Sequence, residues 1–305
     1  MSHFKKFAPQ LLMILASAFW GASFIFTKGL FLSEPNITPT VILTGRMLIA
    51  TLFTVPLLLL TGRLEPMQRK DLKFFLILAL LEPFLYSLCE TGAIRFVSGT
   101  LASIVIATIP LFIPFGMAIV YKEKLRAMAI VGVALSLVGI ALMSLSDNLS
   151  FSASPVGLLL LALAVVIAVL YTLMLVKVLG RYRPTTITTY QNLIALLFFL
   201  PLMLVKDHSV LPMLTFTPRM WLYLAFLGIF CSTLAYMMFN VGIHKLGATS
   251  ASVYNNVIPV FSLLLALLMG QEGLSWTKVL GMAIVLIGLT LSQRKPREAT
   301  TEAKK

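Results

Sequence analysis

The sequence predicts an all-α integral membrane protein of ten transmembrane helices, arranged as two inverted repeats of five helices each. Its composition is the first observation: hydrophobic residues make up 59% and charged residues only 11% of the 305 residues, and the mean hydropathy is +0.98. A soluble domain is far more polar than this. The second observation is that the apolar residues gather into runs of about 20, the length that crosses a bilayer. The third is an internal repeat that relates residues 94–142 to residues 243–291.

The two repeated stretches carry the same short patterns in the same order. Each contains Thr-x-Ala-Ser, then Ile-Pro-x-Phe, then Glu-x-Leu, and finally two glycines spaced as Gly-x6-Gly. Duplicated membrane halves are typical of secondary transporters, which alternate access around a central site. With five helices in each half, the second copy enters the membrane from the opposite face. The acidic residues of the two copies, Glu123 and Glu272, are therefore expected on opposite sides.

Five spans are expected in the first half of the chain. The first begins after Lys5 and Lys6 and resembles a signal peptide, but we interpret it as a retained helix because its removal would upset the five-plus-five count. The polar or charged segments SEPNIT, GRLEPMQRKD, IRFV and YKEKLR separate the later spans. The five spans are predicted at residues 9–31, 39–61, 72–93, 98–120 and 127–146.

Five more spans are expected after the Ser-rich segment DNLSFSAS. The segments between them are LGRYRP, KDHSVLPMLTFT, IHKLG and QEGLS, which combine charged residues with helix-breaking Gly or Pro. We therefore divide the chain into a first repeat at 1–146, a second repeat at 147–292 and a basic cytoplasmic tail at 293–305, expected to be disordered. The spans of the second repeat are predicted at residues 155–178, 185–205, 218–242, 248–270 and 276–292.

The basic residues are concentrated on one side of the predicted membrane. If the N-terminus is cytoplasmic, 18 of the 24 lysine and arginine residues fall in cytoplasmic segments. The positive-inside rule then predicts that both termini are cytoplasmic. The net charge of +13 reports this orientation rather than a nucleic-acid partner. We expect the protein to lie in the inner (cell) membrane, surrounded by the lipid bilayer.

Several motifs resemble the EamA type of the drug/metabolite transporter superfamily. Besides the repeated Glu-x-Leu and Gly-x6-Gly patterns, they are Phe19-Trp20-Gly21 in the first span, Gly45-Arg46 in the second, and the run from Thr100 to Phe112. The resemblance covers residues 8–292. It implies ten helices in two inverted five-helix repeats, a central cavity, and export or uptake of small metabolites, amino acids or drugs. The sequence departs from the family pattern in carrying two acids in the third span and an Asn pair in the ninth.

One acidic residue falls near the middle of a predicted span. A charge at that depth costs about 3 kcal/mol on insertion scales, so Glu82 is a candidate for function. It is followed by Pro83, which removes a backbone hydrogen bond and can kink the helix. A low dielectric favours the protonated form of a carboxyl, which makes Glu82 a candidate proton carrier. The alternative is a structural acid paired with a hydroxyl, a lysine or a backbone N–H that the kink has freed.

Glu90 and Arg46 are predicted in the outer half of adjacent spans. They could form an ion pair, either as an outer gate or as static packing, and a contact between Glu90 and Arg95 is another alternative. Arg46 could instead orient a substrate carboxylate, because the guanidinium fork suits planar acids.

The polar candidates of the second half are amides. An inverted repeat would place a pair of amides at an inner gate, opposite the outer gate formed by Arg46 and Glu90. The alternative is that the amides form ordinary interhelical hydrogen bonds, each worth about 1 kcal/mol. Adjacent residues lie about 100° apart on a helix, so at most one member of the Asn pair is expected to face a cavity squarely. The amide candidates are Gln191, Asn240, Asn255 and Asn256.

Prolines, aromatic residues and glycines complete the candidates. Pro110 and Pro259 occupy equivalent positions in the two repeats and predict a kink in each. The glycines of the Gly-x6-Gly patterns favour close packing of spans 5 and 10, within one protomer or between two. Five aromatic side chains could line a cavity and stack on an organic substrate, or simply pack: Trp20, Tyr86, Tyr171, Tyr236 and Tyr254.

No pattern of an enzyme or a metal site accompanies these residues. The sequence has no Walker loop, no Ser/His/Asp or HExxH arrangement, and no metal-ligand spacing among its three histidines. We therefore expect a protein that is not an enzyme and has no cofactor or metal. The expected function is secondary transport of a small organic metabolite, amino-acid-like or drug-like, outward across the inner membrane by alternating access. Proton coupling and simple facilitated diffusion both fit, as do a monomer and a homodimer. The alternatives are a cationic-drug/proton antiporter and, from a different class, a membrane-embedded enzyme or scaffold.

Overall fold

The computed structural model describes residues 2–122, 127–145, 153–175, 181–246 and 253–293. These residues form helices and their connections, and they contain no strand. Three predictions fall on residues outside these ranges: the boundary between the repeats at 146/147, the disorder of the tail beyond residue 293, and the position of Glu123.

Seven of the described helices are long and apolar enough to cross a membrane. They are Pro9–Ser33, Pro39–Leu60, Arg69–Phe96, Gly99–Val120, Pro155–Leu175, Pro184–Lys206 and Pro218–Leu246. Three shorter apolar helices overlap the predicted spans 5, 9 and 10: Ile130–Met143, Tyr254–Leu268 and Trp276–Leu291. The chain is thus a helical integral membrane protein, whereas the count of ten spans and their inverted arrangement stay predictions.

Several predicted spans are divided into shorter helical elements. In chain order the α-helices are α1 (Ser2–Ser33), α2 (Pro39–Leu60), α3 (Leu72–Ala79), α4 (Tyr86–Phe96), α5 (Gly99–Ala107), α6 (Ile109–Tyr121), α7 (Ala127–Met143), α8 (Pro155–Leu175), α9 (Pro184–Lys206), α10 (Pro218–Phe226), α11 (Ala235–Leu246), α13 (Ile258–Leu268) and α14 (Trp276–Gln293). Two π-helical segments lie between them, η2 (Leu80–Leu85) and η4 (Leu227–Leu234). The 3-10 segments are η1 (Arg69–Asp71), η3 (Leu211–Met213) and η5 (Val253–Val257).

The helix starts follow from local sequence. Thr38, Ser98 and Thr217 each accept a hydrogen bond from a backbone N–H of the first turn, at 3.2 to 3.3 Å, and so cap α2, α5 and α10. A proline follows directly after Thr38 and after Thr217, where its fixed backbone angle suits the first helical position and its missing N–H costs nothing.

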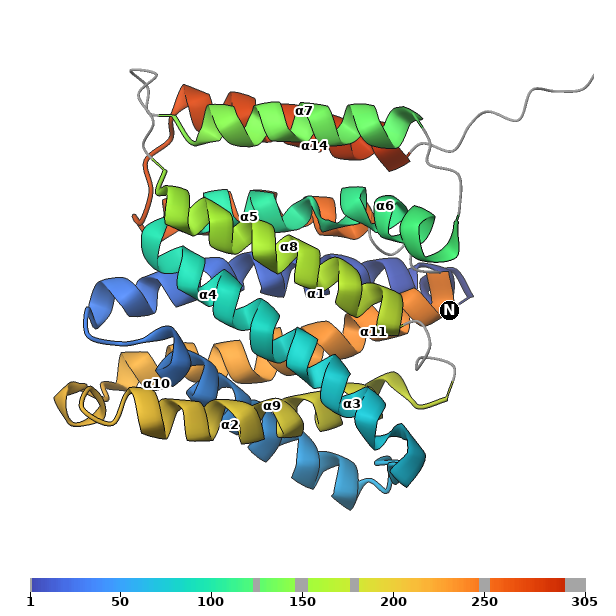
Figure 1. Cartoon of the computed structure of the whole chain (residues 1–305), viewed down its shortest axis with the longest axis vertical. Helices are drawn as coiled ribbons and strands as arrows, with labels where there is room; N and C mark the ends of the chain where they lie inside the picture. Colours follow the sequence, from blue (N-terminus) through green and yellow to red (C-terminus); the bar gives the residue numbers. More distant parts are fainter. Residues whose placement is uncertain (1, 123–126, 146–152, 176–180, 247–252, 294–305) are drawn as a thin grey trace, which may run out of the picture.

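Helices α7 and α14 lie side by side along one edge of the molecule (Figure 1). Their contact is made by the repeated glycines: a Cβ on Gly139 would lie 2.6 Å from the carbonyl oxygen of Gly281, and the reverse distance is also 2.6 Å. A Cβ on Gly288 would lie 2.8 Å from the carbonyl oxygen of Gly132. Only glycine permits such a backbone approach, which confirms the predicted packing of spans 5 and 10 within the chain.

The other helices form the main bundle around α1 (Figure 1). In it α4 packs on α8, α2 packs on α9, and α1 packs on α11 and α13. Each of these contacts joins an element of the first half to one of the second, so neither half is complete without the other.

Three predicted spans of this bundle change their helical geometry beside a proline. Between α3 and α4 the backbone of Glu82 leaves the helical region (φ −143°, ψ 126°), immediately before Pro83. Helix α5 ends at Ala107, with Thr108 as its C-terminal cap, and Pro110 lies in the first turn of α6. Helix α13 likewise starts after the 3-10 segment η5, with Pro259 in its first turn. The interruptions leave backbone groups without helical partners, which side chains or ligands can satisfy.

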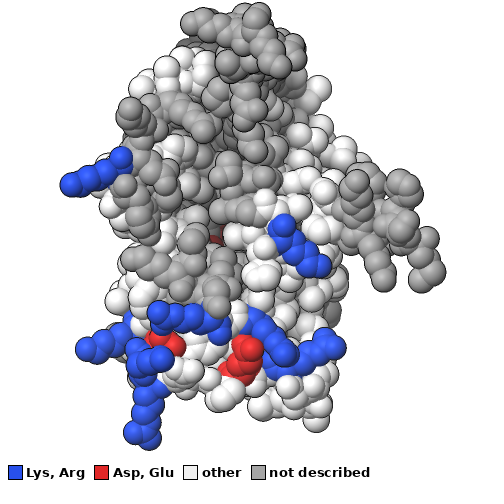
Figure 2. All heavy atoms as spheres, turned by 90° about the vertical axis from the view of Figure 1, so that its right-hand side faces the viewer, with Lys and Arg blue, Asp and Glu red and all other residues white. Residues whose placement is uncertain are grey.

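The end of the bundle that carries the connection between α2 and α3 is basic (Figure 2). Arg181 pairs with Asp71 at 3.0 Å and Arg183 with Glu65 at 3.4 Å, which ties this connection to the one that precedes α9. This is the side predicted to be cytoplasmic. The exposed basic residues of these connections are Arg63, Arg69, Lys70, Lys73, Arg181 and Arg183.

Candidate functional site

A cavity of about 90 Å³ lies inside the main bundle. Its wall takes residues from α1, α2, α4 and their neighbours in the first half, and from α8, α11 and η5 in the second. About 10–15 Å³ suffices for one water molecule, so this cavity has room for a small solute group. The predicted site residues that line it are Trp20, Arg46, Glu82, Tyr86, Glu90, Tyr171, Tyr236, Asn240 and Asn255.

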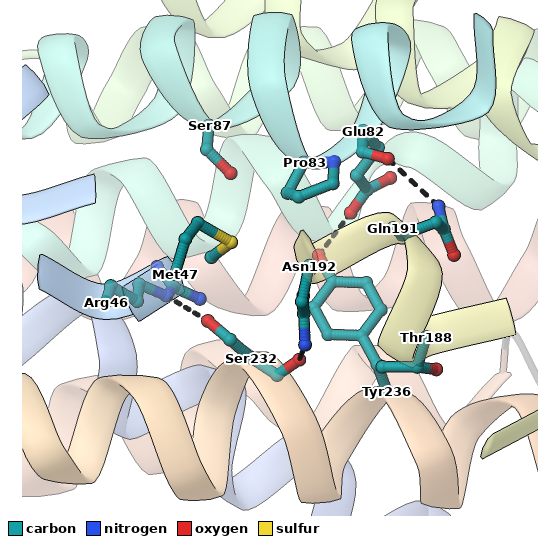
Figure 3. Close-up of a pocket in the computed structure, with 10 residues that line it drawn as sticks. All are labelled: Arg46, Met47, Glu82, Pro83, Ser87, Thr188, Gln191, Asn192, Ser232 and Tyr236. Carbon is teal, nitrogen blue, oxygen red and sulfur yellow. Dashed lines mark hydrogen bonds between the residues drawn. The ribbon is translucent and has the colours of Figure 1, made fainter. Parts of the chain in front are cut away.

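Glu82 occupies the break between α3 and α4, and its side chain is 7% exposed. Its carboxylate accepts a hydrogen bond from the hydroxyl of Tyr236 on α11. Its main-chain carbonyl accepts from the side-chain amide of Gln191 on α9, at 2.9 Å. Both bonds are drawn in Figure 3 and both come from the second half of the chain. The break in one half is therefore held by partners from the other.

Glu90 and Arg46 line the same cavity without forming the ion pair that the sequence suggested. The hydroxyl of Tyr86 donates to Glu90 at 2.8 Å, because four residues along α4 bring the two side chains to one face. The Nε of Arg46 donates to the hydroxyl of Ser232 in η4. Among the described residues, ion pairs within 4.0 Å join neither Glu90 to Arg46 nor Glu90 to Arg95. Arg46 is only 5% exposed, and within the described part of the chain its guanidinium forms no ion pair with a carboxylate.

A recess of about 10 Å³ adjoins the cavity and shares Arg46, Glu82 and Tyr236 with it (Figure 3). Gln191 and Asn192 line this recess rather than the cavity. The amide of Asn192 donates to the main-chain carbonyl of Ser232 at 3.2 Å. The side chains of Gln191 and Asn192 therefore support the residues that line the cavity.

The aromatic wall of the cavity is assembled on Trp20. Its indole N–H donates to the carbonyl of Cys231 at 3.2 Å, and its ring meets those of Tyr236 and Phe239 nearly edge-on, at centroid distances of 5.1 and 4.9 Å. Tyr171 also lines the cavity, whereas Tyr254 packs on an apolar cluster at its side.

The amide candidates separate into different places. Asn240 and Asn255 line the cavity, while Asn256, the neighbour of Asn255, is absent from its described lining. Asn255 and Asn256 both lie in the 3-10 segment η5, where adjacent side chains leave the axis about 120° apart, so the two point in different directions. Asn240 is 1% exposed and donates to the hydroxyl of Thr188 at 3.2 Å.

Several residues of the site were missed by the sequence analysis, among them Thr188, Ser232 and Phe239. Each touches a predicted site residue through the contacts described above. A serine or threonine in an apolar helix commonly bonds to its own backbone, so residue type alone could not single out Thr188 or Ser232. The described residues also contain no group of three His, Cys, Asp or Glu side chains that could hold a metal ion.

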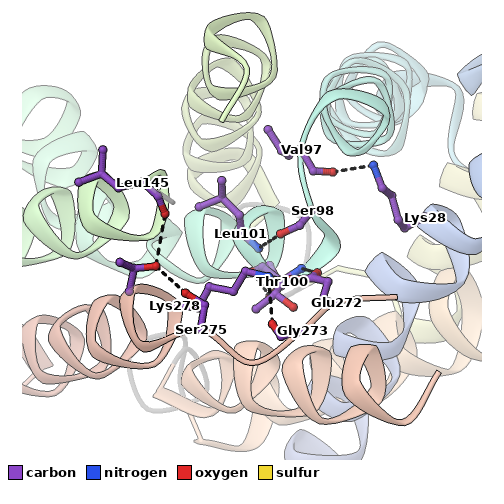
Figure 4. Close-up of polar contacts among 12 residues, drawn as sticks. Lys28, Val97, Ser98, Thr100, Leu101, Leu145, Glu272, Gly273, Ser275 and Lys278 are labelled. Carbon is purple, nitrogen blue, oxygen red and sulfur yellow. Dashed lines mark hydrogen bonds and ion pairs between the residues drawn. The ribbon is translucent and has the colours of Figure 1, made fainter. Parts of the chain in front are cut away.

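The end of the bundle opposite the basic connections is fastened by a polar cluster (Figure 4). Glu272, in the connection between α13 and α14, accepts a hydrogen bond from the backbone N–H of Thr100 at 3.0 Å, and Lys278 pairs with its other oxygen at 2.9 Å. Lys28 donates to the carbonyls of Ile94 and Val97 at 2.9 and 3.0 Å. A connection of the second half is thus fixed to the first turn of α5.

Comparison with known proteins places this architecture in a family. The chain matches the EamA-like transporter family over residues 8–145 and 155–293. It is 26% identical over 261 residues to an uncharacterized transporter, YetK, of Bacillus subtilis, covering 83% of this chain and 78% of that protein. It is 27% identical over 286 residues to an uncharacterized transporter of Archaeoglobus fulgidus, covering 93% of this chain and 98% of that one.

The fold is also found among solved structures. One crystal structure superposes with a TM-score of 0.66 at 18% identity, over 91% of this chain and 97% of that chain. At this identity the likeness concerns the fold alone. The family match covers most of the sequence and confirms the resemblance stated from the motifs: the chain belongs to the EamA-like transporter family.

Proposed function

We propose that the protein is a secondary transporter that exports a small organic metabolite across the inner membrane by alternating access. In this proposal ten helices form two inverted repeats of five, with both termini in the cytoplasm. Membership in a transporter family supports transport over catalysis. The match of the family to residues 8–145 and again to 155–293 supports the repeat.

One observation carries the proposal: a cavity between the two halves of the chain is lined by three buried ionisable residues, Arg46, Glu82 and Glu90. Buried charges in a membrane helix are costly and are retained where they bind a solute or an ion. Alternating access requires a site whose walls come from two bodies that can move against each other, and this cavity has walls from both halves.

Glu82 is the residue that we assign to proton coupling. It lies at a helix break, where a small backbone change can alter its surroundings. Among the residues that the structure describes, the hydrogen bond to its carboxylate comes from the hydroxyl of Tyr236. Release of the proton from Glu82 on one side and capture on the other would link solute movement to the pH gradient. Arg46 is assigned to an anionic group of the solute, because it lines the cavity and forms no ion pair with any carboxylate that the structure describes.

A second candidate function is antiport of an organic cation against protons. The described cavity lining contains two carboxylates, Glu82 and Glu90, but one guanidinium, that of Arg46. A solute cation and a proton would then compete for the carboxylate whose charge Arg46 does not balance.

The test is transport by the full chain in proteoliposomes loaded with pooled amino acids and related metabolites, with and without an imposed pH gradient. We expect gradient-driven efflux by the wild type, and its loss in Glu82→Gln with solute exchange retained. Glu65→Gln, at the basic end and outside the cavity, serves as the matched control and keeps the driven flux. Equal flux without a gradient in wild type and Glu82→Gln would mean facilitated diffusion and return Glu82 to a structural role.

A further inference from the structure

A second, larger cavity lies between α6, α7 and α8, with a volume of about 400 Å³. Pockets that bind small molecules commonly have volumes of about 300 to 1,000 Å³. In the described part of the chain, this cavity shares no lining residue with the central one. Helices α7 and α14 form a layer of their own above α6 in Figure 1, and α7 packs mainly on α14. The second cavity is therefore a separate space, at the junction between the α7–α14 pair and the main bundle.

The wall of this second cavity is hydrocarbon almost throughout. Of the lining residues that the structure describes, two carry a hydroxyl, Thr108 and Ser136. The hydroxyl of Thr108 donates to the carbonyl of Val105 at 2.6 Å, and the hydroxyl oxygen of Ser136 is itself buried, so it does not face the cavity. A polar group placed here would lose its hydrogen bonds without replacement. The cavity is therefore suited to an apolar occupant.

The cavity is open toward the hydrocarbon of the bilayer. Val165 and Val169 in its wall are buried, whereas Ile119, Leu137 and Val166 are exposed and form its rim. All of these residues belong to apolar helices of an integral membrane protein, so lipid rather than water surrounds the rim. Without an occupant, the wall would forfeit its dispersion contacts on one side. The nearest apolar material that can enter is an acyl chain.

The length of the cavity matches one leaflet of a bilayer. Its lining runs from Thr108 to Val120 beside and along α6, a helical rise of about 18 Å, and from Ala162 to Leu173 along α8, about 16 Å. The hydrocarbon core of a bilayer is about 30 Å thick, so each leaflet contributes about 15 Å. One acyl chain can therefore lie along the cavity with its headgroup at the membrane surface.

The end of the cavity at this surface is basic. Helices α6 and α8 end on the side of the molecule that carries the connection between α2 and α3, the side predicted to be cytoplasmic (Figure 1). Lys122 follows directly after α6 and is exposed. It begins the sequence Lys-Glu-Lys-Leu-Arg at 122–126, which has three basic residues and one acidic residue. Basic residues at this position attract the anionic lipids of a cytoplasmic leaflet.

We propose that the cavity between α6, α7 and α8 binds one acyl chain of an anionic phospholipid of the cytoplasmic leaflet, with the lipid headgroup at Lys122. The site is distinct from the central cavity, and the inference does not rest on the proposed transport function. An acyl chain gains little from apolarity alone, because the bilayer around it is as apolar as the cavity wall. Contacts with three helices retain the chain, and the charge of Lys122 selects the headgroup.

The test is photolabelling of the full chain in nanodiscs made of phosphatidylcholine and phosphatidylglycerol. Two probes carry the same diazirine in the middle of one acyl chain, one on phosphatidylglycerol and the other on phosphatidylcholine, and mass spectrometry locates their adducts. Leu52 and Leu59 of α2 are exposed and line neither cavity, so they measure labelling by ordinary surrounding lipid. We expect denser adducts on the second cavity than on these two residues, and more of them from phosphatidylglycerol than from phosphatidylcholine.

Two pairs of variants test the acyl chain and the headgroup separately. Ala162→Phe places a ring in the cavity and should reduce labelling there to the density found on α2. Leu163→Phe is its control, because Leu163 is exposed on the same helix and does not line the cavity. Lys122→Gln should lower the preference for phosphatidylglycerol about fivefold. Lys245→Gln, at an exposed lysine at the end of α11, should leave this preference unchanged.

Three results would overturn the proposal. Labelling of the cavity no denser than that of Leu52 and Leu59 would mean ordinary surrounding lipid. Equal labelling of the cavity by the two probes would mean that no anionic headgroup is selected. Labelling weaker than on α2 would mean that a second copy of the chain covers this face. All three are measured on the wild type, so the test holds even if Ala162→Phe does not fold.

Discussion

The side-chain amide of Gln191 donates to the main-chain carbonyl of Glu82 across 2.9 Å, and so joins α9 to the break before α4. The carbonyl is freed by the departure of Glu82 from helical geometry, and Glu82 is buried. Gln191→Met keeps the length of the side chain and removes the donor. Because a buried carbonyl left unpaired costs about 1–3 kcal/mol, we expect a lower unfolding temperature and a slower gradient-driven flux.

Thermal unfolding in detergent and flux in proteoliposomes measure the two effects of Gln191→Met. Leu197→Met is the control, since it places a methionine on the same helix at a side chain that is 61% exposed. Leu197 also takes no part in the lining of the cavity or the recess. Equal unfolding temperatures for Gln191→Met and the wild type would show that the bond does not stabilise the break.

Arg46 is expected to distinguish a solute with a carboxylate from the corresponding amide. Its Nε is anchored on Ser232, and the rest of the guanidinium lies at the cavity. A charged bidentate contact is worth about 1.5–3 kcal/mol, so Arg46→Met should lower the carboxylate-to-amide selectivity of flux by about ten- to a hundredfold. Arg46→Lys should recover it only in part, because an ammonium lacks the planar fork. Undiminished selectivity in Arg46→Met would place the anionic group of the solute elsewhere.

Glu272 is expected to hold one end of the cavity closed. It ties the connection between α13 and α14 to the N–H of Thr100 at 3.0 Å. Glu272→Ala removes this bond, worth about 1.5–3 kcal/mol because the acceptor is charged, and should shift the population toward a state open at that end. The opening can be measured by alkylation of a cysteine placed at the cavity. The variant carries Ser23→Cys and lacks Cys89 and Cys231. Opening of that end should make an impermeant thiol reagent react with this cysteine faster.

Lys278→Met is the matched control for Glu272→Ala, because it removes the ion pair at 2.9 Å and leaves the bond to Thr100. Its effect on alkylation should be smaller, since a partly exposed ion pair contributes about 0–1 kcal/mol. Equal alkylation rates in Glu272→Ala and the unsubstituted background would rule out a closing role for Glu272.

The contact between α7 and α14 should be sensitive to a single methyl group. In Gly281→Ala the new Cβ would lie 2.4 Å from Cγ of Met143 and 2.6 Å from the carbonyl oxygen of Gly139. Overpacking of this kind costs about 1–3 kcal/mol, so we expect a lower unfolding temperature. Gly273→Ala is the control, because a Cβ there meets nothing within 4 Å. A Gly281→Ala variant as stable as Gly273→Ala would mean that the two helices can separate at little cost.

Depth in the membrane was the useful criterion for the candidate site. Arg46, Glu82 and Glu90 were selected because they fall inside apolar spans, and the structure places all three at one cavity. An ionisable side chain in a membrane helix must turn away from lipid, so residues chosen by depth tend to converge on the interior. Depth could not choose their partners: Glu90 is bonded to Tyr86 on its own helix, not to Arg46.

Periodicity gave little help with the faces of the helices. The helices are apolar on most sides, so the pattern of hydrophobic residues does not show which side faces the interior. Asn255 and Asn256 were for this reason indistinguishable in the sequence, although only Asn255 is found at the cavity.

Composition and the length of the apolar runs were enough to predict helices in a membrane, because hydropathy is a local property of each segment. The repeated motifs carried the resemblance to the family, and the glycine pairs pointed to a close contact of α7 with α14. The partners of the site were decided by the tertiary structure. Tyr236 bonds to Glu82, Ser232 to Arg46 and Thr188 to Asn240 across helices far apart in the chain. A hydrogen bond forms within a few tenths of an ångström of its ideal length, and that distance depends on how two helices rotate and tilt against each other.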